Sequence, residues 1–291
     1  MERLKGCPQA DAALLFVSGQ SNASAHNQPL PENERICRPL KNVWALDRAE
    51  NQNFTSDRVV WSGYTDAGKN LGETQDGTGT ISHYIAAAWQ QAIDAGAALP
   101  DLYIVHISVG SQGIICGKWK MDMPEVAVPG DHLHCNIGLY KLALRTLSMA
   151  SADLKRRFSH PVAIGWHWIG SESDADWGAW DTQDFRRQYD RFFDTQLEAI
   201  GMPCRVWFYK IVYQYVDMES RRKEPFRMEF VNCELRRQVH RLENAELVLT
   251  DESPLWDPSD TVRGVFCADG VHYLCRTQEW FARRFLDEIT E

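Results

Sequence analysis

Apolar residues follow two alternating patterns along most of this chain, and together these patterns predict an α/β fold. Short continuous runs such as Leu14-Leu15-Phe16-Val17 are typical of strands that are buried on both faces of a parallel sheet. Between such runs, apolar residues recur every three or four positions, as on the buried face of a helix. The predicted strands are 14–17, 102–107, 161–169, 204–212 and 245–250, and the predicted helices are 80–97, 137–158, 180–200, 228–242 and 276–289. Because alternating strands and helices build βαβ units, we expect a parallel sheet of about five strands.

The first predicted strand is ended by Gly19, and Ser21 follows almost directly. In open α/β sheets, ligands bind outside the carboxyl ends of the strands, so a hydroxyl at this position faces the cleft. Ser21 is therefore a candidate nucleophile. On this segment alone, a polar residue that simply ends a strand is an equally good interpretation.

Segment 23–79 is rich in Asn, Pro, Gly and Asp and holds only short apolar pieces. So long an irregular stretch inside a compact domain is more often a functional loop region than a linker, and we expect it to wall the cleft. His26 is close to Ser21 in sequence and could be proposed as its base. We interpret His26 as an exposed loop histidine, because a better candidate lies near the end of the chain.

That better candidate is Asp269-Gly270-Val271-His272, just before the last predicted helix. An Asp and a His three residues apart on one turn can approach each other, so the carboxylate can orient the imidazole and stabilise its charged form. A serine hydroxyl is a poor nucleophile until such a base takes its proton. The alternative interpretation of this segment is a surface turn.

Two further segments follow predicted strands. Gly110 comes after strand 102–107, and a glycine there permits close approach of the backbone to a ligand, although it can also be a simple turn. After strand 161–169 the chain reads Gly170-Ser171-Glu172-Ser173-Asp174-Ala175. Its two acids can equally be loop residues that cap the following helix.

In this order, the four segments resemble the sequence blocks of the SGNH (GDSL-like) hydrolase superfamily. Gly19-Gln20-Ser21-Asn22 and the segment from Trp168 to Ala175 resemble the form found in its carbohydrate acetylesterase branch, which includes sialate O-acetylesterases and acetylxylan esterases. The resemblance covers nearly the whole chain. It implies a three-layer α/β/α sandwich of the flavodoxin-like kind. The short connections late in the chain and the absence of a break in composition predict a single domain over residues 1–291.

The resemblance also implies the roles of individual residues. Ser21 would be the nucleophile, His272 the base and then the acid, and Asp269 the residue that orients the imidazole. The backbone NH groups of Ser21 and Gly110 would stabilise the oxyanion. The residues expected to bind the substrate are Gln20, Asn22, Gln112 and Glu172. No metal or cofactor is required.

The third block departs from the family pattern at two positions. Where the family carries Gln this chain has Gly170, and where the family carries Gly it has Ser171. In the family, this block supplies a side-chain amide to the oxyanion hole. Ser171 or Gln112 can donate a hydrogen bond in its place, and we expect Ser171 to complete the hole.

Composition excludes several other classes of protein. The net charge of −9 argues against a nucleic-acid partner, whose phosphates need a basic face. No apolar run approaches a membrane span and no signal-peptide stretch is visible, so the cytoplasm is the expected location; a chain whose leader was removed would be secreted. The eight cysteines show no CxxC spacing and are expected to be reduced.

Several alternatives stay open at this point. His132 and His134 invite a metal interpretation, but alternate loop residues are not a recognised ligand spacing, so we expect no metal site. Trp119 can stack on a sugar or cover the edge of the core. The expected substrate is an O-acetylated carbohydrate such as sialic acid or another acetylated glycan. Two alternative interpretations are an SGNH esterase that acts on lipids or thioesters, and a carbohydrate-binding protein whose oxyanion hole is impaired by the missing Gln.

Overall fold

The structure is a computed structural model that describes residues 3–51, 58–73, 76–122, 138–177, 182–212 and 225–291. The strands within these residues are β1 (Ala12–Gly19), β2 (Val43–Leu46), β3 (Trp61–Gly63), β4 (Asp101–Ser108), β5 (Pro161–Ile169), β6 (Val206–Tyr209) and β7 (Ala245–Val248). They form one seven-stranded sheet in the order β3-β2-β4-β1-β5-β6-β7. All neighbouring pairs are parallel except β2 with β3.

The predicted parallel sheet is confirmed, but the expected number of about five strands is too low. Both additional strands, β2 and β3, lie in segment 23–79, which the sequence predicts to be irregular. β2 pairs with β4 over three residues and β3 is only three residues long. Apolar runs this short do not stand out against neighbouring Asn, Pro and Gly.

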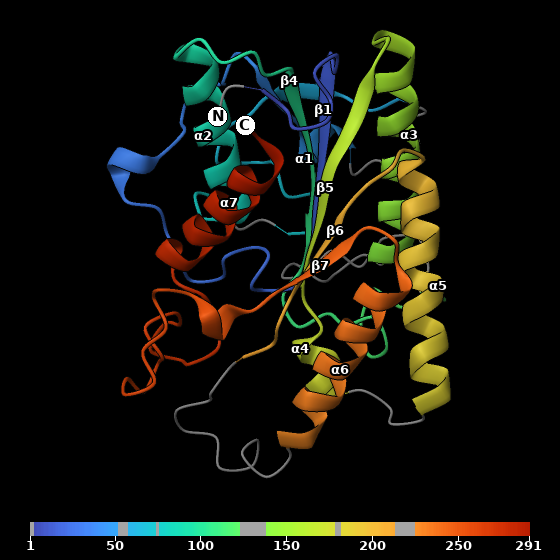
Figure 1. Cartoon of the computed structure of the whole chain (residues 1–291), viewed down its shortest axis with the longest axis vertical. Helices are drawn as coiled ribbons and strands as arrows, with labels where there is room; N and C mark the ends of the chain where they lie inside the picture. The colour runs from blue at the N-terminus through green and yellow to red at the C-terminus, as the bar shows by residue number, and fades with distance from the viewer. Residues whose placement is uncertain (1–2, 52–57, 74–75, 123–137, 178–181, 213–224) are drawn as a thin grey trace.

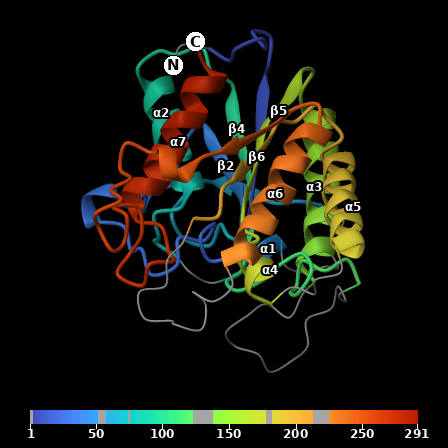
Figure 2. The ribbon, with the colours of Figure 1, turned by 60° about the horizontal axis from the view of Figure 1, so that its bottom comes forward.

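Helices cover both faces of the sheet and complete the predicted three layers (Figure 1). One face carries α2 (Ile81–Asp94) and α7 (Cys275–Ile289), and the other carries α3 (Leu139–Arg157), α5 (Thr182–Ile200) and α6 (Pro225–Arg241). Figure 2 shows the same division from below, with α6 on the side of α3 and α5. The remaining short helices are α1 (Arg48–Asn51), α4 (Glu172–Trp177) and two 3₁₀ turns, Glu32–Glu34 and Thr250–Glu252. The five long helices were all predicted, with ends that differ by a few residues.

Strand β1 explains why a continuous apolar run marks the centre of the sheet. Leu14 and Phe16 belong to the core beneath α3 and α5, whereas Leu15 and Val17 belong to the core beneath α2 and α7. Successive side chains of a strand point to opposite faces, so both faces require apolar residues. All eight residues of β1 are buried.

The parallel register brings three strand ends together. Gly19 at the end of β1 lies beside Ser108 of β4 and Ile169 of β5. The segments that follow these strands therefore meet at one edge of the sheet, which is where open α/β folds bind ligands.

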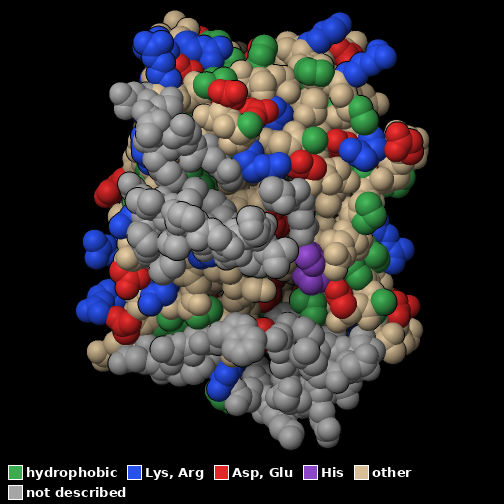
Figure 3. All heavy atoms as spheres, turned by 180° about the vertical axis from the view of Figure 1, so that it is seen from behind, with side chains coloured by type: hydrophobic (Ala, Val, Ile, Leu, Met, Phe, Trp, Pro, Cys, Tyr) green, Lys and Arg blue, Asp and Glu red, His purple; other side chains and the backbone are tan. Residues whose placement is uncertain are grey.

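Charge is distributed without a large region of one sign on the face drawn in Figure 3, where Lys and Arg side chains alternate with Asp and Glu. Within the described residues, no helix combines the length and apolar character that crossing a bilayer would need.

Candidate active site

Ser21 lies just beyond the carboxyl end of β1, where Gly19 lets the chain bend sharply. Gly19 has a φ of 143°, and a Cβ at this position would lie 1.9 Å from the carbonyl oxygen of Ile169. Only glycine fits this close approach. The indole Nε1 of Trp119 donates to the carbonyl oxygen of Gly19 at 2.9 Å, and Trp119 is fully buried. Trp119 therefore holds the end of the strand and belongs to the core, not to a sugar-stacking surface.

His272 and Asp269 form the pair that their spacing predicts. His272 Nδ1 lies 2.6 Å from Asp269 Oδ2, while Asp269 Oδ1 accepts from the backbone NH groups of Val271 and His272 at 2.9 and 3.0 Å. Burial raises the pKa of Asp269, but the hydrogen bonds from His272 and Val271 outweigh it and hold the pKa below its ordinary value. A carboxylate in this place favours the imidazole tautomer that is protonated on Nδ1 and free to accept a proton on Nε2.

Asn22 ties the segment of Ser21 to the segment of His272. Its side-chain Nδ2 donates to the carbonyl oxygen of Val271 at 3.2 Å, and its Oδ1 accepts from the NH of Tyr273 at 2.9 Å. The residue after Ser21 thus binds the backbone on both sides of His272. Two loops that are 250 positions apart in the sequence are thereby held against each other.

Glu172 and Gln20 also have partners inside the protein. Glu172 Oε1 accepts from Asn22 Nδ2 at 2.8 Å, and Gln20 Oε1 accepts from the NH of Ser173 at 3.2 Å. Burial raises the pKa of Glu172. These contacts give Gln20, Asn22 and Glu172 a role in holding the site together, and their contacts with the substrate stay a prediction.

Gly110 follows β4 and lies next to Ser21. A Cβ on Gly110 would lie 3.7 Å from the Cβ of Ser21. The NH of Gly110, predicted to bind the oxyanion, donates to Glu73 Oε2 at 3.1 Å. Gln112, a predicted substrate-binding residue, bridges its own loop: Nε2 donates to the carbonyl oxygen of Gly110, and Oε1 accepts from the NH of Lys118.

The segment after β5 explains both departures from the family pattern. A Cβ on Gly170 would lie 3.2 Å from the ring of Trp168 and 3.3 Å from the Cα of Gly19, so a glutamine fits poorly there. Ser171 has a φ of 85°, a left-handed conformation that glycine adopts most easily. Its hydroxyl accepts from Trp168 Nε1 at 2.9 Å, and the residue is fully buried. The O–H of Ser171 is still able to donate, so its role as the third oxyanion donor stays a prediction.

Two residues near Ser21 were not selected as site residues from the sequence. The ring of His26 lies 4.9 Å from the ring of His272, and the NH of His26 donates to the carbonyl oxygen of Ser21. His26 is half-buried, not exposed as expected. The other residue is Glu73, which no motif marks. Its proximity to Gly110 arises from tertiary structure alone.

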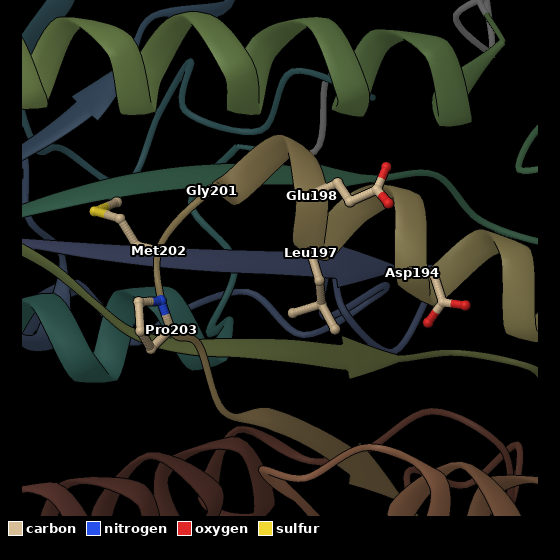
Figure 4. Close-up of a pocket in the computed structure, with 6 residues that line it drawn as sticks. All are labelled: Asp194, Leu197, Glu198, Gly201, Met202 and Pro203. Carbon is tan, nitrogen blue, oxygen red and sulfur yellow. The ribbon is translucent and has the colours of Figure 1, made fainter.

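Among the described residues, a pocket lies away from Ser21, and no cluster of side chains forms a metal centre. The described part of the chain holds no group of three His, Cys, Asp or Glu side chains arranged to bind a metal; His132 and His134 lie outside it. A surface pocket between the end of α5 and the start of β6 is lined by Asp194, Leu197, Glu198, Gly201, Met202 and Pro203 (Figure 4). Because β6 begins there, this pocket lies at the amino ends of the strands, opposite Ser21.

Comparison with known proteins identifies the fold. No protein-family model and no curated protein matches the sequence. Among solved structures, NanS matches with a TM-score of 0.59 at 16% identity, covering 96% of this chain and 98% of that chain. A protein from Arabidopsis thaliana matches with a TM-score of 0.54 at 15% identity, covering 96% and 99%. Together with the order of strands and the four sequence blocks, these matches show that the chain has the fold of the SGNH hydrolases.

Proposed function

We propose that this protein is a serine esterase that removes O-acetyl groups from a carbohydrate through an acyl-enzyme intermediate. The observation that carries the proposal is that Asn22, the residue after Ser21, binds the backbone on both sides of His272 and so holds the segment of Ser21 against the Asp269–His272 pair. A nucleophile, a base and a residue that orients the base are the three parts that acyl transfer by serine requires.

The proposed reaction proceeds in two steps. Ser21 Oγ attacks the ester carbonyl carbon while His272 Nε2 takes the hydroxyl proton, and the oxyanion is bound by the NH groups of Ser21 and Gly110. The tetrahedral intermediate then collapses, and His272 returns the proton to the departing sugar oxygen. In the second step, His272 takes a proton from water as the water oxygen attacks the acetyl carbonyl carbon. The bond to Ser21 Oγ then breaks, His272 returns the proton to Oγ, and acetic acid leaves and ionises to acetate.

A polar substrate fits this site better than a lipid. Two polar residues lie close to Ser21: the NH of His26 donates to the carbonyl oxygen of Ser21, and Glu73 binds the NH of Gly110, which adjoins Ser21. Among the described residues, the large hydrophobic side chains that are exposed are Val60 and Phe226. The likeness of the four sequence blocks to the carbohydrate acetylesterase branch favours an acetylated sugar.

The direct test is acetate release from an aryl acetate and from acetylated sugars by the wild type and Ser21→Ala. We expect the substitution to reduce kcat by at least about 10³-fold, because no other group supplies the acyl acceptor. Ser259→Ala, at an exposed serine, is the matched control and should retain activity. Full turnover by Ser21→Ala would refute the mechanism. A folded wild type that releases no acetate but binds sugars would favour a carbohydrate-binding protein.

A further inference from the structure

The carboxylate of Glu73 binds the Gly110 NH, which the proposed reaction assigns to the ester oxyanion. Glu73 Oε2 accepts from the NH of Gly110 at 3.1 Å, and the same Oε2 would lie 3.9 Å from a Cβ on Gly110. The Cβ of Ser21 would lie 3.7 Å from that same Cβ, so both side chains border Gly110. Glu73 is 7% exposed and therefore sits in the wall of the site.

The backbone around Glu73 is held firmly against the end of β4. Asn70 Oδ1 accepts from the NH of Ser108, and Asn70 Nδ2 donates to the Ser108 hydroxyl at 2.9 Å. A Cβ on Gly72 would lie 2.2 Å from the carbonyl oxygen of Ser108, so only glycine allows this approach. Arg48 Nη1 donates to the carbonyl oxygen of Glu73 at 2.6 Å. The position of Glu73 beside Gly110 is thus fixed by several independent contacts.

The Glu73 carboxylate is incompletely satisfied. Oε1 has no hydrogen-bond partner, and no Lys or Arg of the described residues forms an ion pair with this carboxylate. A buried carboxylate with an unpaired oxygen destabilises a fold unless a ligand supplies the missing donor. Oε1 itself is buried, so a donor on a bound substrate meets it only when the carboxylate turns away from the Gly110 NH. In an acetylated sugar, the natural donor is a hydroxyl next to the ester.

Glu73 also competes for the NH that the proposed reaction needs. As long as Oε2 accepts from Gly110, that NH is not available to an ester oxyanion. A hydroxyl that binds the carboxylate would draw it from Gly110 and release the NH. Binding of a correct substrate and completion of the oxyanion hole would then be one event.

We propose that Glu73 is a specificity-determining residue, which withholds the Gly110 NH until a hydroxyl adjacent to the acetyl ester binds its carboxylate. The inference rests on the proposed esterase function. It makes the protein selective for acetyl groups on polyhydroxylated substrates and a poor catalyst for esters that lack a neighbouring hydroxyl.

Three substrates test this selectivity: 4-nitrophenyl acetate, a methyl glycoside with one acetyl group next to a free hydroxyl, and the same glycoside with that hydroxyl methylated. For the wild type, we expect kcat/KM for the hydroxyl form to exceed that for the methylated form by about tenfold or more, as for a hydrogen bond to a charged group. Equal kcat/KM for the two glycosides would overturn the proposal.

Variants of Glu73 provide the second arm. In Glu73→Ala the Gly110 NH is free, so kcat/KM for 4-nitrophenyl acetate should rise about tenfold, while the preference for the free hydroxyl disappears. Glu73→Gln keeps the side-chain volume, and its kcat/KM for 4-nitrophenyl acetate should lie between those of the wild type and Glu73→Ala. This variant preserves the test if Glu73→Ala does not fold. Glu198→Gln, at an exposed acid of α5, is the matched control and should behave as the wild type. A fall in aryl acetate hydrolysis in both Glu73 variants would refute the proposal.

Parallel assays of Ser21→Ala separate the two levels of inference. If Ser21→Ala retains activity, the esterase mechanism itself fails. If Ser21→Ala is inactive and the substrate preference does not depend on Glu73, the esterase mechanism stands and only the proposed role of Glu73 is refuted.

Discussion

The contact between His272 and Asp269 gives a sharp prediction for a single atom. Asp269 Oδ1 is fixed by two backbone NH groups, so in Asp269→Asn the amide oxygen must stay there and the NH₂ group must face His272 Nδ1. Nδ1 then becomes an acceptor and the ring proton moves to Nε2, where it blocks the base. We expect kcat to fall by about 10²- to 10⁴-fold, measured with an aryl acetate.

A control distinguishes this tautomer effect from a loss of structure. Asp287→Asn, at an exposed position of α7, changes the same group and should keep wild-type kcat. The thermal unfolding midpoint of Asp269→Asn should stay near that of the wild type, because the backbone contacts survive. If Asp269→Asn kept full kcat, His272 would not be the base.

Short-range motifs revealed the candidate nucleophile, acid and base, whereas long-range contacts stayed hidden. Asp269 and His272 are three residues apart, so their spacing alone predicts a contact. Trp119 and Gly19 are separated by 100 positions, and nothing in the sequence joins them. Glu73 is equally invisible, because its partner Gly110 follows a different strand. Assignment of Ser171 to the oxyanion hole did not anticipate that its hydroxyl would bond to Trp168.

At the scale of elements, α4 fastens the loop after β4 to α5 through one carboxylate. Asp174 is fully buried and accepts from the NH groups of Ile114 and Ile115 at 2.9 and 2.8 Å and from the Tyr189 hydroxyl at 2.8 Å. The loop it fastens continues directly from Gly110. The sequence offered this residue only as a helix-capping acid or a member of a family block.

Replacing Asp174 should therefore loosen three elements together. In Asp174→Ala, three buried donors lose their acceptor, and we expect the free energy of unfolding in urea to fall by about 3 kcal/mol or more. Asp174→Asn retains one acceptor oxygen, so its free energy of unfolding should fall less than that of Asp174→Ala. Asp287→Ala on α7 serves as the exposed comparison. A loss below about 1 kcal/mol in Asp174→Ala would show that these donors find other partners.

Elements were predictable where burial on both faces imposed a long apolar run, as in β1, β4 and β5. They were not predictable where pairing alone creates the strand. β2 gains its place because Val43, Trp44 and Ala45 pair with β4, and β3 follows only as the partner of β2. The single-domain organisation over residues 1–291 stays a prediction.

For the whole molecule, buried histidines link stability to pH. His106 and His167 are 4% and 0% exposed, and burial lowers the pKa of each from 6.5 to about 3. Between pH 3 and 6.5 the unfolded chain binds protons on both imidazoles and the folded chain does not. Unfolding therefore takes up protons, and stability falls as the pH decreases below 6.5. These two groups contribute a slope that approaches about 2.7 kcal/mol per pH unit.

The buried carboxyls change the stability with pH in the opposite direction to the histidines. A variant is therefore needed to assign part of the slope of stability against pH to one histidine. Burial raises the pKa of Glu172 and Asp174, and each contributes stability at low pH that is lost as the pH rises through its folded pKa. His167→Gln leaves both carboxyls unchanged and keeps a polar partner for the hydroxyl of Tyr209, which lies 2.7 Å from His167 Nδ1. Urea unfolding between pH 7.5 and 5 should show a slope that is shallower by up to about 1.4 kcal/mol per pH unit in this variant. An unchanged slope would mean that His167 takes up no proton on unfolding, contrary to its burial.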